Sequence, residues 1–217
     1  MMKNIFEFFM NRSRARKYKQ FLRFCSPTRN DKVLDVGVQD KDYMGNDNTL
    51  ERNYPHRRMI TALGIEKLGN FRKRYLGVKA VTYNGKIFPF KKDSFDFVWS
   101  NAVIEHVGPE KRQELFISEM LRVCKRKIVF TTPNRWFPME THTKLPLFHW
   151  LPKGACDTIY KVLGKKWATG SYMYLLGKND LKRMLDKVSK KHKFSYRIVS
   201  NRLLCMPATF TVLISKD

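Results

Sequence analysis

The sequence lacks the features that mark disulfide-rich, zinc-binding and membrane-spanning proteins. It has only four cysteines, and because no two of them form a CxxC pair, a zinc knuckle and a thioredoxin-type motif are excluded. No apolar run approaches the roughly 20 residues that a membrane-spanning helix needs. The apolar residues near the N-terminus are too few for a signal peptide. We therefore expect a cytoplasmic protein in a reducing compartment, with a peripheral position at the inner membrane surface as an alternative.

Acidic residues are scarce. The 217 residues include 43 Lys+Arg but only 19 Asp+Glu, which gives a formal net charge of +24. Such a surface attracts polyanions, so nucleic acid, an anionic membrane surface and acidic glycans are all candidate partners. A basic surface that only faces solvent explains the same numbers equally well. The sequence leaves the oligomeric state open.

Residues 1–24 predict an N-terminal basic helix. An aromatic stretch, Ile5 to Met10, comes first and is followed by the basic run Arg14 to Lys19. This order is typical of a segment that lies on an anionic membrane surface. The alternative is a helix that packs its aromatic side chains on the domain that follows.

Short apolar runs and helical periodicity alternate along the rest of the chain. The runs predict strands at 32–37, 59–65, 78–83, 94–100 and 127–131, followed by a closing antiparallel pair at 194–199 and 208–215. Helices are predicted at 70–75, 109–124 and 180–190. The alternation predicts one α/β domain, residues 25–217, whose doubly wound parallel sheet is covered by helices on both faces. Residues 134–176 interrupt this alternation of strands and helices and predict a lid insertion over one end of the sheet.

Small and polar residues follow the predicted strands, where open α/β sheets bind their ligands. In chain order they are Asp35 and Gly37, then Glu66, then Asn84 and Gly85, then Ser100, Asn101 and Ala102. An acid that ends a strand can bind a ribose diol, and a glycine lets a ligand approach the backbone. These residues outline a nucleoside-shaped site. Because GxGxxG and GxxxxGK[ST] are both absent, an NAD-type site is disfavoured and a P-loop is excluded.

The stretches that carry this site are similar to the motifs of a known family. VLDVG (33–37), FPFKKDSFDFVWSNAVIEHV (88–107) and EMLRVCKRKIVFTTPNRWFP (119–138) resemble class I S-adenosylmethionine-dependent methyltransferases, in the group related to the menaquinone/ubiquinone enzymes (methyltransferase type 11-like). The resemblance covers about residues 30–135. It implies a Rossmann-like sheet of seven strands, six parallel and one antiparallel.

The resemblance also implies S-adenosyl-L-methionine as the cofactor and assigns residues to it. Glu66 falls at the ribose-binding acid and Asn84 with Gly85 at the adenine contact; Asp35, Gly37 and Val38 fall in the first motif, and Ser100, Asn101 and Ala102 line the cofactor. The family's first motif usually continues as GxGxG, whereas this chain has one glycine, in GVQDK (37–41). The departure predicts that residues 38–48 contact the methionine part of the cofactor differently, or that the chain does not bind it.

Candidate residues on the acceptor side follow the fourth and fifth predicted strands. His106 is either a general base for a substrate hydroxyl or a residue that packs at a helix start. Thr132, Asn134 and Trp136 are candidate substrate contacts, and Trp136 belongs alternatively to the core of the lid. No metal ligands are predicted. His142 and His149 are expected to be structural residues of the insertion.

The sequence as a whole favours a methyltransferase that acts on a small-molecule, lipid-linked or glycan-linked acceptor. An RNA methyltransferase is an alternative that the net charge suggests, although the [DNS]PP[YFW] signature of enzymes that methylate base amino groups is absent. A third hypothesis is that the chain is a non-catalytic relative, which keeps the fold as a binding protein or scaffold. Titration with S-adenosylmethionine separates the third hypothesis from the first two.

Overall fold

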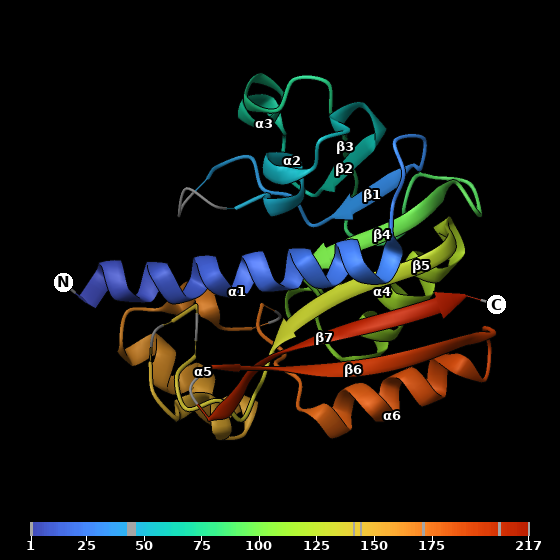
Figure 1. Ribbon diagram of the computed structural model, residues 1–217. Helices are drawn as coiled ribbons and strands as arrows, with labels where there is room; N and C mark the ends of the chain where they lie inside the picture. The colour runs from blue at the N-terminus through green and yellow to red at the C-terminus, as the bar shows by residue number, and fades with distance from the viewer. Residues whose placement is uncertain are drawn as a thin grey trace.

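A mixed sheet forms the centre of the structure (Figure 1). The computed structural model describes residues 2–42, 47–140, 142–143, 145–170, 172–203 and 205–216, with side chains from residue 7 onwards. The strands are β1 (Val33–Val36), β2 (Ile60–Gly64), β3 (Lys79–Thr82), β4 (Phe95–Asn101), β5 (Cys124–Pro133), β6 (Phe194–Leu203) and β7 (Met206–Lys216). Their order across the sheet is β3-β2-β1-β4-β5-β7-β6. Only β7 runs antiparallel to its neighbours, which confirms the predicted fold.

Helices cover both faces of this sheet. They are α1 (Met2–Cys25), α2 (Thr49–Asn53), α3 (Gly69–Arg74), α4 (Glu110–Val123), α5 (Lys153–Val162) and α6 (Lys178–Ser189), with short 3-10 turns η1 (Arg57–Met59), η2 (Ile104–His106), η3 (Phe148–Trp150) and η4 (Lys166–Ala168). The four helices predicted from periodicity correspond to α1, α3, α4 and α6. The helices α2 and α5 are not among these four.

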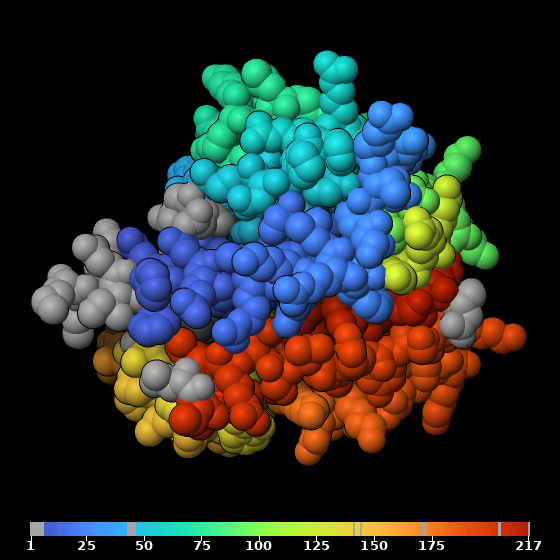
Figure 2. Space-filling model, in the orientation of Figure 1, coloured from blue at the N-terminus to red at the C-terminus, as the bar shows by residue number. Residues whose placement is uncertain are grey.

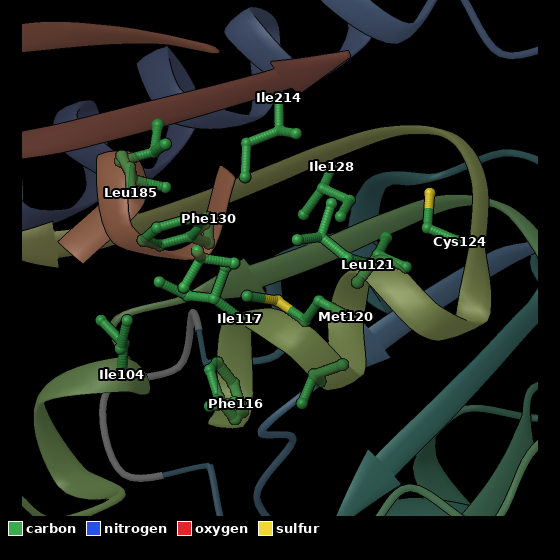
Figure 3. Close-up of a cluster of buried hydrophobic side chains, with 14 of the residues drawn as sticks. Ile104, Phe116, Ile117, Met120, Leu121, Cys124, Ile128, Phe130, Leu185 and Ile214 are labelled. Carbon is green, nitrogen blue, oxygen red and sulfur yellow. The ribbon is translucent and has the colours of Figure 1, made fainter. Parts of the chain in front are cut away.

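The alternation of side chains along β1 divides the interior into two hydrophobic cores. Leu34 and Val36 belong to the core that α4 and α6 cover, and Figure 3 shows part of this core around Phe116, Ile117 and Phe130. Val33 belongs to the opposite core, under α1 and α2. Since β1 is buried on both faces, its sequence reads as a nearly continuous apolar run.

The helix α1 is built into the second core. Phe21 is fully buried, and its ring packs edge-on against Trp99 of β4 with the centroids 5.4 Å apart. Gln20 hydrogen bonds to Asn201 of β6 and Thr211 of β7. The N-terminal turns extend beyond the carboxyl ends of β1, β4 and β5 (Figure 1), and Figure 2 shows the helix as a band across the surface. The helix predicted at residues 1–24 is therefore part of the packed structure.

The segment between β5 and α6 has a small core of its own. Cys156 and Tyr160 of α5 pack with Ala168 and Met173 there. Hydrogen bonds join the segment to η2 and α4: the Tyr174 amide donates to the Glu105 carbonyl oxygen, and the Gln113 side chain donates to the Tyr174 carbonyl oxygen. This segment corresponds to the insertion predicted at 134–176. Its function as a lid stays a prediction.

Candidate functional site

The residues predicted to bind the cofactor lie along one edge of the sheet. Since β3, β2, β1 and β4 are adjacent and parallel, their carboxyl ends meet there. Hydrogen bonds join these ends: the Gly37 amide donates to the Leu63 carbonyl oxygen at 2.8 Å, and Ser100 Oγ donates to the Val36 carbonyl oxygen at 3.0 Å. The topology thus brings the predicted positions from four strands to the same edge.

Gly37 is required at its position by the backbone. Its φ is +97°, and a Cβ atom added there would lie 2.2 Å from Cγ2 of Val103, in the turn that follows β4. Both facts exclude larger residues. The adjacent Val38 is buried in a small core with Ala62 and Leu68, so its side chain does not face a ligand and only its backbone lies at the edge.

The loop after Gly37 is closed by a side-chain amide instead of further glycines. Asn48 accepts a hydrogen bond from the Gln39 amide at 3.0 Å and donates to the Gln39 carbonyl oxygen at 2.9 Å. Asp40 accepts hydrogen bonds from the Asn70 side chain and the Phe71 amide, which fixes the loop to the start of α3. Within the predicted contact loop 38–48, residues 43–46 lie outside the described part of the chain.

Asp35 is buried at the end of β1 and faces a second buried acid, Glu51 of α2. Burial, and then the adjacent Glu51, raises the pKa of Asp35 well above its ordinary value. Burial also raises the pKa of Glu51 to about 7. Both shifts favour the protonated form of a carboxyl in this pair, and sequence reasoning did not predict the partner of Asp35.

Glu66, Asn84 and Gly85 are exposed at the ends of β2 and β3. The Glu66 carbonyl oxygen accepts a hydrogen bond from Thr82 at 3.1 Å, which joins the two strand ends. Asn84 Oδ1 accepts from the Lys86 amide at 3.0 Å, so this side chain also shapes a turn. Gly85 has a φ of +76°. The Glu66 carboxylate is thus accessible at the position predicted for a ribose ligand.

Asn101 and Ala102 shape the end of β4. Asn101 Oδ1 accepts a hydrogen bond from Thr131 of β5 at 2.7 Å, and the Ala102 amide donates to the Thr131 carbonyl oxygen at 3.0 Å. Ala102 has a φ of +57°, a left-handed conformation that is uncommon for alanine. This sharp turn leads the chain directly into η2, which carries Glu105 and His106.

The three predicted substrate contacts have structural partners. Thr132 is buried and donates a hydrogen bond to Glu105 Oε2 at 3.0 Å. Asn134 is buried, donates to the Pro207 carbonyl oxygen and accepts from the Trp136 amide. The Trp136 indole is half-exposed and lies near the Trp150 ring, with the centroids 6.2 Å apart. Their contact with a substrate stays a prediction.

His106 lies beside a second histidine and a buried acid. Its Nε2 is 3.1 Å from Nε2 of His142, and its Nδ1 is 2.9 Å from the Tyr172 carbonyl oxygen. Burial is the main reason that the pKa of His106 is below its ordinary value. His142 in turn hydrogen bonds to Glu140 through Nδ1 at 2.8 Å. Burial opposes ionisation of Glu140, but its hydrogen bonds to His142 and Thr143 lower its pKa to about 2.

Lys17 of α1 is buried close to this group. Burial lowers the pKa of Lys17 to about 8, and the nearby charge of Glu105 opposes the shift. These neighbours could not be predicted, because Lys17 and His142 are far from Glu105 along the chain. The pairs Glu105-His106 and Glu140-x-His142 are the only local signals that they leave.

A cavity of about 420 Å³ lies under the N-terminal turns of α1. Phe9, Met10 and Met139 contribute apolar surface to it, and Arg12 and Arg16 contribute positive charge. The β6–β7 hairpin closes one side. The cavity combines apolar walls with cationic groups.

Comparison with known proteins agrees with this geometry. Residues 59–130, about a third of the chain, match the sequence profile of a family described as "Methyltransferase domain". Similar solved structures include the methyltransferase domain of bacterial CtHen1, with 16% identity, a TM-score of 0.61, and 94% of this chain and 98% of that chain covered. A comparison with curated protein sequences found no match.

Two further solved structures have the same fold. An S-adenosylmethionine-dependent methyltransferase from Mesorhizobium loti has 13% identity and a TM-score of 0.61, with 90% of this chain and 95% of that chain covered. Magnesium protoporphyrin IX methyltransferase from Synechocystis PCC 6803, solved with bound SAH, has 14% identity and a TM-score of 0.57, with 94% and 84% covered. The chain thus has the fold of the class I S-adenosylmethionine-dependent methyltransferases, and the resemblance predicted from its motifs is confirmed.

Proposed function

We propose that the protein is a methyltransferase that uses S-adenosyl-L-methionine. The observation that carries this proposal is the strand order, which collects Asp35, Gly37, Glu66 and Asn84 at one edge of the sheet. This edge is where open α/β sheets bind nucleosides. The fold alone does not define an activity, so the proposal depends on the residues at the edge.

The residues present at the edge fit this cofactor. The exposed Glu66 carboxylate can accept hydrogen bonds from a ribose diol, and Asn84 can hydrogen bond to an adenine edge. Gly37 follows β1 at this edge, and its φ of +97° lets the chain turn there against Val103. When bound, the cofactor supplies an electrophilic methyl group on a sulfonium sulfur. The chain's own residues then have to orient the acceptor and exclude water.

For the acceptor, we propose a small molecule or a lipid- or glycan-linked molecule. The cavity of about 420 Å³ supports an acceptor that has both an apolar and an anionic part, because Phe9 and Met139 line it together with Arg12 and Arg16. Methylation of RNA is the alternative, since the net charge of +24 attracts any polyanion. None of the helices in the described part of the chain has the length and apolar character of a membrane span.

Calorimetric titration of the purified protein with S-adenosylmethionine and S-adenosylhomocysteine tests the proposal. We expect saturable one-to-one binding by the wild type. Glu66→Ala should abolish binding while the unfolding temperature stays near that of the wild type, because Glu66 is exposed. Glu114→Ala is the matched control: it removes an acid on α4 that pairs with Lys187 at the surface, and it should bind normally.

The other outcomes point to the alternatives. No binding by the wild type at millimolar ligand contradicts the proposal and favours a non-catalytic protein of this fold. Normal binding by Glu66→Ala contradicts the assignment of the edge. If the cofactor binds, methyl transfer from labelled cofactor to RNA, anionic lipid or glycan extracts separates the acceptor classes.

A further inference from the structure

Three side chains that can bind a metal converge near the carboxyl ends of β4 and β5. Glu105 and His106 lie in η2, directly after β4, and His142 lies in the segment that follows β5. One ligand atom from each residue lies within 4.8 Å of the other two. The hydrogen bonds around these atoms decide what the group can bind.

Both histidines use Nδ1 as a hydrogen-bond donor. His106 Nδ1 faces the Tyr172 carbonyl oxygen, which can only accept, so this nitrogen carries the proton. His142 Nδ1 faces Glu140, whose carboxylate also accepts hydrogen bonds from the backbone amides of His142 and Thr143. In their neutral forms the two imidazoles therefore present the lone pairs of Nε2 to each other, at 3.1 Å.

Glu105 adds a third acceptor. Its side chain is fully buried, and Oε2 accepts the hydrogen bond from Thr132. Oε1 is buried with no hydrogen-bond partner in the described part of the chain, and it lies 4.0 Å from His106 Nε2. A buried carboxylate oxygen without a partner is destabilising. The three acceptor atoms thus converge on a position that a cation would satisfy.

We propose that Glu105, His106 and His142 bind a divalent first-row transition-metal ion, such as Mn²⁺, Fe²⁺, Co²⁺ or Zn²⁺. Two histidines and one carboxylate form a known type of site for such ions. Two nitrogen ligands at about 2.1 Å from one ion and at right angles are about 3 Å apart, which agrees with the distance between the two Nε2 atoms. Binding requires the two imidazole rings to turn so that both Nε2 lone pairs point at one position, and it requires Oε1 to move closer to the nitrogens.

The surroundings of the three residues also match a metal site. Histidine ligands of metals usually donate their second N–H to a carboxylate or a backbone carbonyl, and here Glu140 and Tyr172 accept these bonds. A proton shared between the two Nε2 atoms is the alternative occupant. It would satisfy the histidines but would leave Oε1 of Glu105 without a partner, whereas a metal ion satisfies all three atoms.

The metal site narrows the class of acceptor in the proposed function. This part of the inference rests on the proposal that the protein is a methyltransferase. An ion with three protein ligands keeps open positions, and it lowers the pKa of a hydroxyl group that binds there, whose proton passes to water. Glu105 follows Ala102, which is predicted to line the cofactor, by three residues along the chain. We therefore assign the acceptor to the hydroxyl-bearing compounds that can bind a metal through oxygen. In this assignment His106 is a metal ligand and not a general base.

Titration of the untagged, metal-free protein with Co²⁺ tests the site, because the visible absorption of bound Co²⁺ reports its ligands. We expect saturation at one Co²⁺ per chain. His142→Ala and Glu105→Gln should each weaken binding by about 100-fold or more, since each removes a ligand. Glu140→Gln should weaken it by about 10–100-fold, because Glu140 only orients His142.

Controls separate this site from binding elsewhere. His56 is exposed and remote from the three ligands in sequence, so His56→Ala should bind Co²⁺ like the wild type. Circular dichroism shows whether each variant is folded, and Glu105→Gln preserves the shape of the side chain if His142→Ala does not fold. The absence of saturable binding by the wild type, or equal binding by the wild type and the folded ligand variants, overturns the metal site.

Two further measurements keep this inference distinct from the proposed function. S-adenosylhomocysteine binding is measured on metal-free protein: if Co²⁺ binds and S-adenosylhomocysteine does not, the metal site stands and the methyltransferase proposal fails. If only S-adenosylhomocysteine binds, the metal site fails alone. A catechol, as a bidentate oxygen ligand, should change the absorption of bound Co²⁺, and an unchanged spectrum overturns the assignment of the acceptor.

Discussion

Replacing Glu51 with glutamine should make the protein more stable at neutral and alkaline pH. Burial raises the pKa of Glu51 from 4.5 to about 7 in the folded protein, and the neighbouring Asp35 is shifted in the same direction. Because the folded state retains the proton longer than the unfolded state, stability is fully present below pH 4.5 and is lost as the pH rises through about 7. At about 1.4 kcal/mol per pH unit, the loss from Glu51 alone is about 3 kcal/mol.

The assay is urea denaturation of the wild type and of Glu51→Gln at a series of pH values from 4 to 8, ~0.5 units apart. The free energies of unfolding should be similar at the acid end, and the variant should gain about 3 kcal/mol by the alkaline end. For a chain of this size that difference corresponds to roughly 6–12 °C in unfolding temperature. Glu114→Gln removes a half-buried acid that pairs with Lys187; it controls for charge and should follow the wild type. A constant difference between Glu51→Gln and the wild type across this range would refute the reasoning.

Two other predictions concern the glycine after β1 and the N-terminal helix. Gly37→Ala should lower the free energy of unfolding by about 2–4 kcal/mol, because its Cβ would collide with Val103 at a positive φ; Val103→Ala in the same chain should restore part of this loss in urea denaturation. Phe8 and Phe9 are 59% and 36% exposed on α1, so the double variant Phe8→Ser/Phe9→Ser should bind anionic vesicles more weakly in a sedimentation assay. Equal sedimentation of the variant and the wild type would show that α1 does not contact the membrane.

The strands at the centre of the sheet could be predicted, because each is buried on both faces and reads as an apolar run. The predicted fifth strand, 127–131, was too short: β5 begins at Cys124 and continues to Pro133. Its first three residues were missed because Lys125 and Arg126 do not continue the apolar run. In the structure the Arg126 guanidinium pairs with Asp31 at 3.2 Å, and Lys127 donates to the Phe24 carbonyl oxygen, so their charges reach partners at the rim. A charged residue within a strand is therefore compatible with strand pairing when its long side chain places the charged group at the rim of the sheet.

The insertion was harder to predict because its helix packs on the insertion itself. In α5 the buried residues are Cys156 and Tyr160, one turn apart, and Gly154 weakens the helical pattern at its start. The apolar residues that cover this helix, including Ala168 of η4 and Met173, come from short 3-10 turns and irregular segments and not from a neighbouring periodic element. Local periodicity therefore carried little information about this segment.

The two sides of the candidate site differ in how far the sequence revealed them. The cofactor side follows from strand ends, and a strand end is a local property that a glycine or an acid marks. The acceptor side depends on a contact between residues that are 36 positions apart, His106 and His142, and no spacing rule predicts such a pair. Thr132 was predicted to bind substrate because it follows the predicted fifth strand, 127–131; in the structure its hydroxyl donates to the carboxylate of Glu105.

The same contact ties the chemistry of the acceptor side to the position of the insertion. Glu105 and His106 belong to the turn after β4, which the sheet holds in place through Thr132. His142 and Glu140 belong to the insertion, and Tyr172, which accepts the hydrogen bond from His106, also lies there. The three acceptor atoms therefore come together only when the insertion packs on the carboxyl end of the sheet. A cation bound between them would hold that packing, so assembly of the acceptor site and docking of the insertion would be a single equilibrium.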